Sequence, residues 1–67
     1  MAVARVTEIS STSPKSFDDA IQQGIARATK TLRGVRSAWV KEQRVDIRND
    51  KITEYQVNLM VTFVLED

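Results

Sequence analysis

Trp39 and Gln56 are the two residues whose side chains could hold a flat ligand. The indole of Trp39, the only tryptophan, offers a π surface for stacking, and the amide of Gln56 offers a donor beside an acceptor, which matches the edge of a cyclic imide. Trp39 takes an odd position in a run whose core-facing neighbours, Ala38 and Val40, are even, so strand alternation directs the indole away from the core. An exposed aromatic ring of this size indicates either a contact between subunits or a planar heteroaromatic ligand.

The two residues belong to consecutive predicted strands. If these strands pair as an antiparallel hairpin, Trp39 and Gln56 fall on the same outer face of the sheet. A twofold axis between protomers would then supply a second copy of both groups, and two indoles would enclose one flat ring. The sequence leaves open a purely structural alternative, in which Trp39 is buried between protomers.

The sequence offers little for catalysis, and we expect the protein not to be an enzyme. It has no histidine and no cysteine, so the usual nucleophiles and bases are missing. Its only glycines, Gly24 and Gly34, do not form a glycine-rich phosphate-binding loop. Asp46, Asn49 and Asp50 carry oxygens that suit a hard cation, but their spacing does not match a calcium loop. We predict that they are turn residues and that there is no metal site.

Length and charge place the chain among small soluble proteins. Its 67 residues predict a single domain, residues 1–67. Ten Lys and Arg against nine Asp and Glu give a net charge of +1, which argues against a nucleic-acid-binding protein. No apolar run reaches the ~18 residues that cross a bilayer, and the first residues do not resemble a signal peptide. We therefore expect a cytoplasmic protein without nucleic-acid or membrane partners.

A chain of this size has a marginal core and needs additional stabilisation. It buries about 60% of the surface that its unfolded chain exposes, and small domains usually add disulfides, a metal or association. Disulfides and most zinc chemistry are excluded because the sequence has neither cysteine nor histidine. Association remains, so we predict an obligate homo-oligomer.

One amphipathic helix is predicted from Pro14 to Arg33. Ser13 is the expected N-cap, and Ser16 is a rival cap one turn later. Gly34 is expected to adopt the left-handed conformation at C′ that ends the helix. Gly24 lies on the apolar stripe, where it indicates close approach of the sheet. The stripe consists of Phe17, Ala20, Ile21, Gly24, Ile25, Ala28 and Leu32.

Three strands are predicted, over residues 3–9, 35–48 and 52–65. Asn49 and Asp50 form the expected hairpin turn between the last two strands. A right-handed crossover through the helix places the first strand beside the third. The third strand alternates cleanly, and its expected helix-facing residues are Tyr55, Val57, Leu59, Val61, Phe63 and Leu65.

The apolar residues of the second strand change from even positions, Ala38 and Val40, to odd positions, Val45 and Ile47. This change predicts a bulge or sharp bend between Glu42 and Arg44, because a regular strand cannot bury both apolar sets on one face. The predicted fold is α+β with β-α-β-β order: a three-stranded antiparallel sheet packed on one face against a single helix. The other face is expected to serve the assembly.

Short stretches along almost the whole chain are typical of one family of small proteins. They are Thr12-Ser13-Pro14, Ala20-Ile21-Gln22, Ile25-Ala26-Arg27-Ala28, Thr31-Leu32-Arg33, Val40-Lys41-Glu42, Tyr55-Gln56-Val57 and Phe63-Val64-Leu65-Glu66. The chain resembles the dodecins, βαββ proteins that assemble into hollow dodecameric shells and bind flavins between paired tryptophans. The resemblance implies a homododecamer with a flavin, riboflavin or FMN, at its subunit junctions.

The position of the stacking tryptophan differs from the family pattern. In flavin-binding dodecins this tryptophan occupies what is here Ser37, whereas Trp39 follows two residues later. Two residues along a strand keep the same face but move the ring by about 6.5–7 Å. The resemblance therefore implies either that Trp39 stacks from a displaced position or that the pocket has different walls.

The resemblance also assigns expected roles to polar residues. Gln56 matches the glutamine that hydrogen-bonds the isoalloxazine edge, Glu42 an acidic position near the ribityl chain, and Arg44 a contact to the FMN phosphate in some members. Val64 stands where such members carry a second phosphate-binding arginine, which weakens the case for tight FMN binding relative to riboflavin. The expected function is flavin storage or sequestration. The alternatives are a dodecin-like shell that binds another small ligand or a cation, and a purely structural shell.

Overall fold

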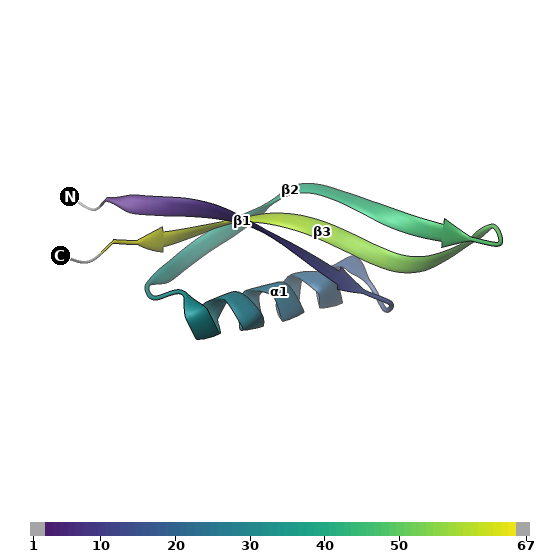
Figure 1. Cartoon of the computed structure of the whole chain (residues 1–67), viewed down its shortest axis with the longest axis horizontal. Helices are drawn as coiled ribbons and strands as arrows, with labels where there is room; N and C mark the ends of the chain where they lie inside the picture. Colours follow the sequence, from purple (N-terminus) through teal and green to yellow (C-terminus); the bar gives the residue numbers. More distant parts are fainter. Residues whose placement is uncertain (1–2, 66–67) are drawn as a thin grey trace.

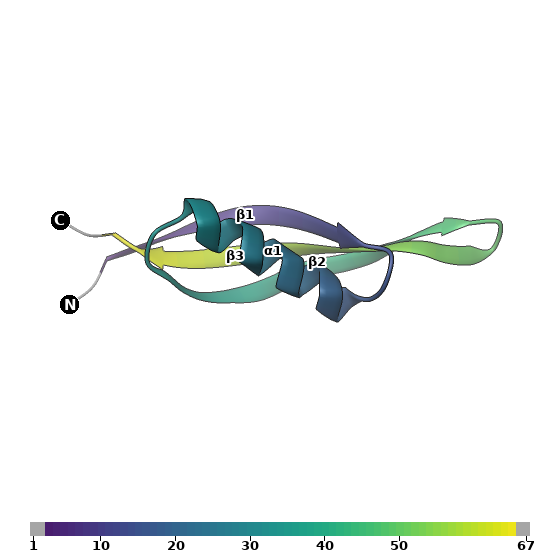
Figure 2. The same ribbon diagram turned by 90° about the horizontal axis from the view of Figure 1, so that it is seen from below.

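The fold is one antiparallel sheet with a helix across one of its faces (Figure 1, Figure 2). The computed structural model describes residues 3–65 and contains β1 (Ala4–Ser13), α1 (Phe17–Thr31), β2 (Val35–Arg48) and β3 (Lys51–Val64). The strand order is β1-β3-β2, and β3 pairs antiparallel with both neighbours. The predicted β-α-β-β order and three-stranded antiparallel sheet are confirmed. Glu66, the last residue of the family-like stretches, lies outside the described residues.

β1 continues past its predicted end at residue 9 as far as Ser13. Its last residues pair with β3, where Ser13 lies opposite Tyr55. The run from Ser10 to Ser13 has no apolar alternation, so its strand character comes from this pairing and is not visible in the local pattern.

The helix begins after Ser16 and not after Ser13. Ser16 has extended backbone and its Oγ accepts a hydrogen bond from the N–H of Asp19 at 3.0 Å, so it is the N-cap and Phe17 is the first helical residue. The predicted cap at Ser13 is wrong because Ser13 is still part of β1. Its buried hydroxyl donates instead to the Asp19 carboxylate at 2.5 Å, which ties the end of β1 to the first turn of α1.

Acid should weaken the fold through Asp19. The hydrogen bond from Ser13 is the main reason why the pKa of Asp19 lies below its ordinary value of 3.8; desolvation opposes the shift, and the Gln23 amide and the charge of Lys15 add to it. A carboxyl with a lowered folded-state pKa stabilises the fold above its unfolded-state value, and this contribution is lost as the pH falls from about 5 through the folded-state pKa. Ser13→Ala should therefore lose less stability than the wild type on acidification, measured by urea unfolding at several pH values. The exposed Ser10→Ala is the matched control, and a Ser13→Ala profile parallel to the wild type would contradict this role.

The helix also ends earlier than predicted. Leu32 is the C-cap, with extended backbone and an N–H that donates to the carbonyl of Ala28 at 2.9 Å, so α1 stops before Arg33. Gly34 has the predicted positive φ of 72°, but the expectation that it is the C′ residue is wrong because it lies two residues past the cap. A Cβ at Gly34 would lie 3.1 Å from the carbonyl oxygen of Val64. The glycine is therefore required where the chain passes close to β3.

Gly24 confirms the predicted close approach of helix and sheet. A Cβ added to this buried residue would lie 3.0 Å from the Cβ of Ser11 and 3.2 Å from the Cδ1 of Leu59. Gly24→Ala should destabilise the fold by up to about 2 kcal/mol, because overpacking of about 1–3 kcal/mol exceeds the helix-propensity gain of about 1 kcal/mol. Ser11→Gly should partly rescue this variant, whereas Ser11→Ala keeps the obstructing Cβ and should not. Urea unfolding of the single and double variants measures the coupling, and strictly additive effects would contradict the contact.

β2 and β3 form a long hairpin whose tip extends beyond α1 (Figure 1). Asn49 and Asp50 have φ of 51° and 64°, the left-handed values that a two-residue type I′ turn requires, and the turn prediction is confirmed. Ile47 and Ile52 pair across the hairpin near this turn and are 66% and 52% exposed. The single chain therefore leaves an apolar pair uncovered near the hairpin tip.

The core lies between α1 and the middle of the sheet, and its buried apolar residues are Ala20, Ala28, Val57, Leu59 and Val61. At the start of α1, Phe17 packs edge-on against Tyr55, with ring centroids 5.1 Å apart. The predicted alternation of β3 is confirmed from Tyr55 to Val61. The expectation for Leu65 is wrong, because β3 ends at Val64 and Leu65 is 47% exposed.

α1 packs mainly against β1 and β3, so that β2 lies at the more open side of the sheet. Val40 on β2 is exposed although it pairs with the buried Leu59. Within residues 3–65, no helix has the length and apolar character needed to cross a membrane.

Candidate functional site

All five residues that the sequence predicts as ligand-binding lie on one face of the sheet. Leu59 and Val61 are buried under α1, so the residues between and beside them on β3 point to the opposite side. Residues paired across antiparallel strands share a face. This helix-free face therefore carries the pairs Ser37–Thr62, Trp39–Met60, Glu42–Asn58 and Arg44–Gln56.

A β-bulge at Lys41 keeps the β2 residues of this set on one face. Their positions are odd before the bulge and even after it. The register between β2 and β3 shifts between Val40 and Glu42, which leaves Lys41 as the extra residue. The predicted position of the bulge, between Glu42 and Arg44, is wrong because these two residues already follow regular alternation on the helix-free face. Lys41 also reaches this face, where its Nζ lies 3.2 Å from Oε1 of Glu8.

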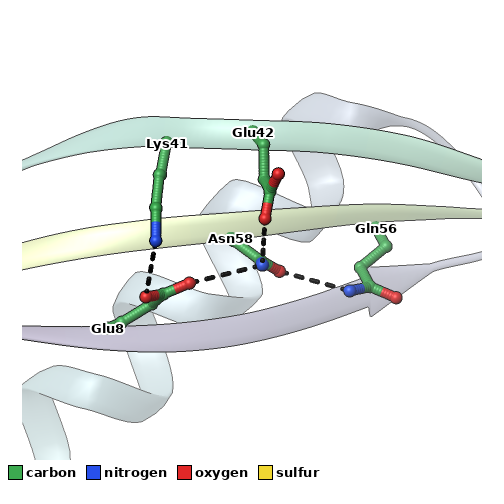
Figure 3. A network of polar contacts seen from close by, with 5 residues as sticks. All are labelled: Glu8, Lys41, Glu42, Gln56 and Asn58. Atoms are coloured by element: carbon green, nitrogen blue, oxygen red, sulfur yellow. Dashed lines mark hydrogen bonds and ion pairs between the residues drawn. The ribbon is translucent and has the colours of Figure 1, made fainter.

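Five side chains on the helix-free face form a network of hydrogen bonds and one ion pair (Figure 3). Asn58 is at its centre: its Nδ2 donates to Oε1 of Glu42 at 3.1 Å and to Oε2 of Glu8 at 3.4 Å. Nε2 of Gln56 donates to Oδ1 of Asn58 at 3.2 Å. The ion pair between Lys41 and Glu8 completes this amide–carboxylate network, which joins all three strands.

A small hollow lies beside the amide–carboxylate network. It has a volume of about 80 Å³ and is lined by Glu42, Gln43, Arg44, Gln56 and Asn58. Three of the predicted site residues, Glu42, Arg44 and Gln56, thus line the same hollow. Typical small-molecule pockets have roughly 300–1,000 Å³, so a single chain offers an open polar surface with both charge signs and not a closed site.

Trp39 and Ser37 lie outside this hollow, farther along β2. Both border a groove of about 590 Å³ between β2 and α1, which Ile21 and Ile25 of the helix also line. Trp39 is 52% exposed and pairs with Met60, which confirms the outward orientation predicted from parity. Met60 is four residues from Gln56, roughly 13 Å along β3. The indole and the Gln56 amide therefore share a face without sharing a cavity.

Asn58, Glu8 and Lys41 are the members of the network that the sequence-based prediction did not include among the site residues. Asn58 was detectable in principle, because it lies two residues from Gln56 on a regular strand and so shares its face. Glu8 was not, because its approach depends on the register of β1 against β3, in which Glu8 lies opposite Met60. No local pattern encodes that register.

The residues of the hairpin turn have the backbone conformation of a tight turn. Asn49 and Asp50 take the positive φ values of a tight turn, in agreement with their prediction as turn residues. Across residues 3–65 of the chain, no three side chains of His, Cys, Asp or Glu come together in a way that could hold an ion.

The sequence and the fold match those of known proteins closely. The family model described as Dodecin matches residues 3–66. A dodecin from Thermus thermophilus is 43% identical over 65 residues, which cover 97% of this chain and 94% of the relative. The dodecin from Streptomyces davaonensis superposes with a TM-score of 0.92 at 38% identity and covers 98% of this chain and 97% of its own.

A further solved structure extends the comparison to a different ligand. It is a calcium dodecin from Mycobacterium tuberculosis, described as a calcium-chelating antigen with a novel calcium-binding site. It superposes with a TM-score of 0.82 at 32% identity, covering 96% of this chain and 91% of its own. The family match along nearly the whole sequence, together with the shared β-α-β-β fold, shows that this chain belongs to the dodecin family.

Proposed function

We propose that this protein binds a flavin, riboflavin or FMN, and stores or sequesters it at the subunit junctions of a hollow homododecamer in the cytoplasm. The observation that carries the proposal is the position of Trp39 and Gln56 on the same helix-free face. An exposed indole supplies a stacking surface, and the amide supplies a donor and an acceptor for the imide edge of the ring. Membership of the dodecin family supports the choice of a flavin over other flat heterocycles.

A second protomer is needed to complete such a site. The hollow at Gln56 is about 80 Å³, far too small for a tricyclic ring, and the indole of Trp39 is half exposed. Association in general is also favoured by the exposed apolar side chains Val40, which lies on the helix side of the sheet opposite Leu59, and Ile47 and Ile52 near the hairpin tip, since so few apolar residues are buried within one protomer. A twofold axis across the helix-free face would supply two indoles and two amides to one enclosed slot.

The family resemblance assigns roles to Arg44 and Glu42, and the charges of both residues suit these roles. Arg44 pairs with Gln56 and provides a cation for the phosphate of FMN, while Glu42 provides an acceptor for ribityl hydroxyls. Val64 adds no second cation. We therefore expect FMN to gain little affinity over riboflavin.

These residues suit a protein that stores a flavin better than an enzyme that uses it for turnover. The chain has no histidine or cysteine to act as base or nucleophile. A flavin stacked against an indole is held where electron transfer quenches its excited state. Binding would therefore protect the cell from flavin photochemistry.

Titration of riboflavin with the apo-protein tests this function. Flavin fluorescence should fall as the protein is added, because stacking on Trp39 quenches the excited ring. Protein purified with its ligand should also be yellow. Unchanged riboflavin fluorescence at micromolar protein would remove the flavin hypothesis.

A cation is the second candidate ligand, supported by the calcium dodecin among the similar structures. Glu8 and Glu42 both approach Nδ2 of Asn58 on the helix-free face, and carboxylate oxygens suit Ca²⁺. Within residues 3–65 of one protomer these two carboxylates are not joined by a third, so a calcium site would draw ligands from a neighbour. Calorimetric titration with CaCl₂ should give a binding heat that Glu8→Gln/Glu42→Gln abolishes if this candidate is correct.

A further inference from the structure

We propose that Asn58 is a positioning residue that fixes the direction of the Gln56 amide and so decides which of its polar atoms meets the ligand. The inference rests on the proposed role of Gln56 in flavin binding and adds the residues that orient it. It draws on the amide–carboxylate network of the helix-free face (Figure 3).

The direction of the Asn58 amide is set by two carboxylates. Oε1 of Glu42 lies 3.1 Å and Oε2 of Glu8 lies 3.4 Å from Nδ2 of Asn58. Ionised carboxylates can only accept hydrogen bonds, so Asn58 must turn its NH₂ group to this side and its oxygen away from it. Lys41, 3.2 Å from the other oxygen of Glu8, helps to hold that carboxylate in place.

The Asn58 amide in turn sets the direction of Gln56. Oδ1 of Asn58 lies 3.2 Å from Nε2 of Gln56, and a carbonyl oxygen can only accept a hydrogen bond. A flipped Gln56 would place two carbonyl oxygens against each other. Gln56 therefore keeps its NH₂ group towards Asn58, and Oε1 points away from the network (Figure 3).

A ligand at this face consequently meets a prepared acceptor. Asn58 uses one N–H of Gln56, which leaves Oε1 and the second N–H free. An imide edge presents an N–H between two carbonyls, so Oε1 accepts from the imide N–H and the free N–H donates to one carbonyl beside it. Because Gln56 is already ordered, binding does not have to immobilise its side chain.

Asn58→Leu tests the inference because it removes the acceptor for Gln56 with little change of shape. Riboflavin binding should weaken by about 2- to 10-fold, the cost of ordering one free side chain. The preference for riboflavin over N3-methylriboflavin, which lacks the imide N–H, should fall by about 3-fold or more, since a free Gln56 can turn its NH₂ group towards the ligand carbonyls. Thr62→Val is the matched control, because it removes a polar group from the same strand and face outside the network. Fluorescence titration with both flavins should give wild-type values for this control.

A second measurement needs no ligand. The side-chain NH₂ of Gln56 should have an NMR order parameter of about 0.8 in the wild type and in Thr62→Val, and below about 0.6 in Asn58→Leu. If Asn58→Leu assembles poorly, the shape-preserving Glu8→Gln/Glu42→Gln removes the two obligatory acceptors and should loosen Gln56 in the same direction. A Gln56 amide that stays as ordered as in the wild type would overturn the proposal. If wild-type protein fails to quench riboflavin, flavin binding is refuted, and the NMR comparison still decides the role of Asn58.

Discussion

Replacing Trp39 by alanine should weaken riboflavin binding by roughly 5- to 150-fold. Removing an aromatic side chain that stacks on a heterocycle costs about 1–3 kcal/mol, and about 1.4 kcal/mol is a factor of ten in affinity. Trp39 is half exposed on the helix-free face, so the truncation leaves the core of the protomer untouched. Fluorescence titration measures the affinity, and light scattering of the same sample measures the size of the assembly.

Trp39→Phe is the matched variant for this prediction, because it keeps an aromatic face of smaller area. Its affinity should lie between those of the wild type and Trp39→Ala. An assembly that falls apart in Trp39→Ala would contradict the stacking role and favour the structural alternative, in which Trp39 is a contact between protomers. If Trp39→Ala assembles normally and binds riboflavin with unchanged affinity, side chains other than Trp39 form the pocket.

Leu59→Ala should destabilise the protein by about 2–5 kcal/mol, enough to unfold much of a small domain. Leu59 is 1% exposed and belongs to the small group of buried side chains under α1. Truncation leaves a cavity at the centre of a core that is already marginal for a chain of this size. Urea unfolding followed by circular dichroism measures the loss.

Leu65→Ala provides the matched control, since the same chemical change falls on a leucine that is 47% exposed. Its effect on stability should be at most about 1 kcal/mol. Equal losses in Leu59→Ala and Leu65→Ala would contradict the assignment of the core. A large loss only for Leu65→Ala would place that residue in an interface that outweighs the core of the single protomer.

The fold was predictable because two of its elements carry strong periodic signals. The alternation along β3 and the apolar stripe of α1 identify both elements from local sequence, and Asn49 with Asp50 marks the turn between β2 and β3. These signals suffice for the β-α-β-β order and for the face on which α1 packs. Together with the short stretches typical of the family, they made the family predictable as well.

Element boundaries were less predictable because several residues satisfy the same local rule. Ser13 and Ser16 both have the chemistry of an N-cap, and only the pairing of Ser13 within β1 decides between them. The change of parity in β2 required a bulge, but its position at Lys41 depends on how β2 pairs with β3. Long-range register, which a single sequence does not encode locally, settles both cases.

The sequence predicted which face of the sheet carries the candidate site. It did not predict the amide–carboxylate network on that face. Strand parity alone placed Trp39 outward, and hairpin pairing placed Gln56 on the same face of the sheet. The approach of Glu8 to Asn58 requires the register between β1 and β3, which no sequence motif reports. The orientation of Gln56 follows only once these partners are known.

Sedimentation velocity of the protein mixed with riboflavin tests most directly whether copies of this chain enclose a flat ligand on their helix-free faces. Absorbance recorded in the ultraviolet follows the protein, and absorbance in the visible band follows the flavin. The expected result is one large homo-oligomer that carries the visible absorbance with it. A colourless species with the 7.6 kDa mass of a single chain, with all riboflavin left behind in the supernatant, would contradict the account.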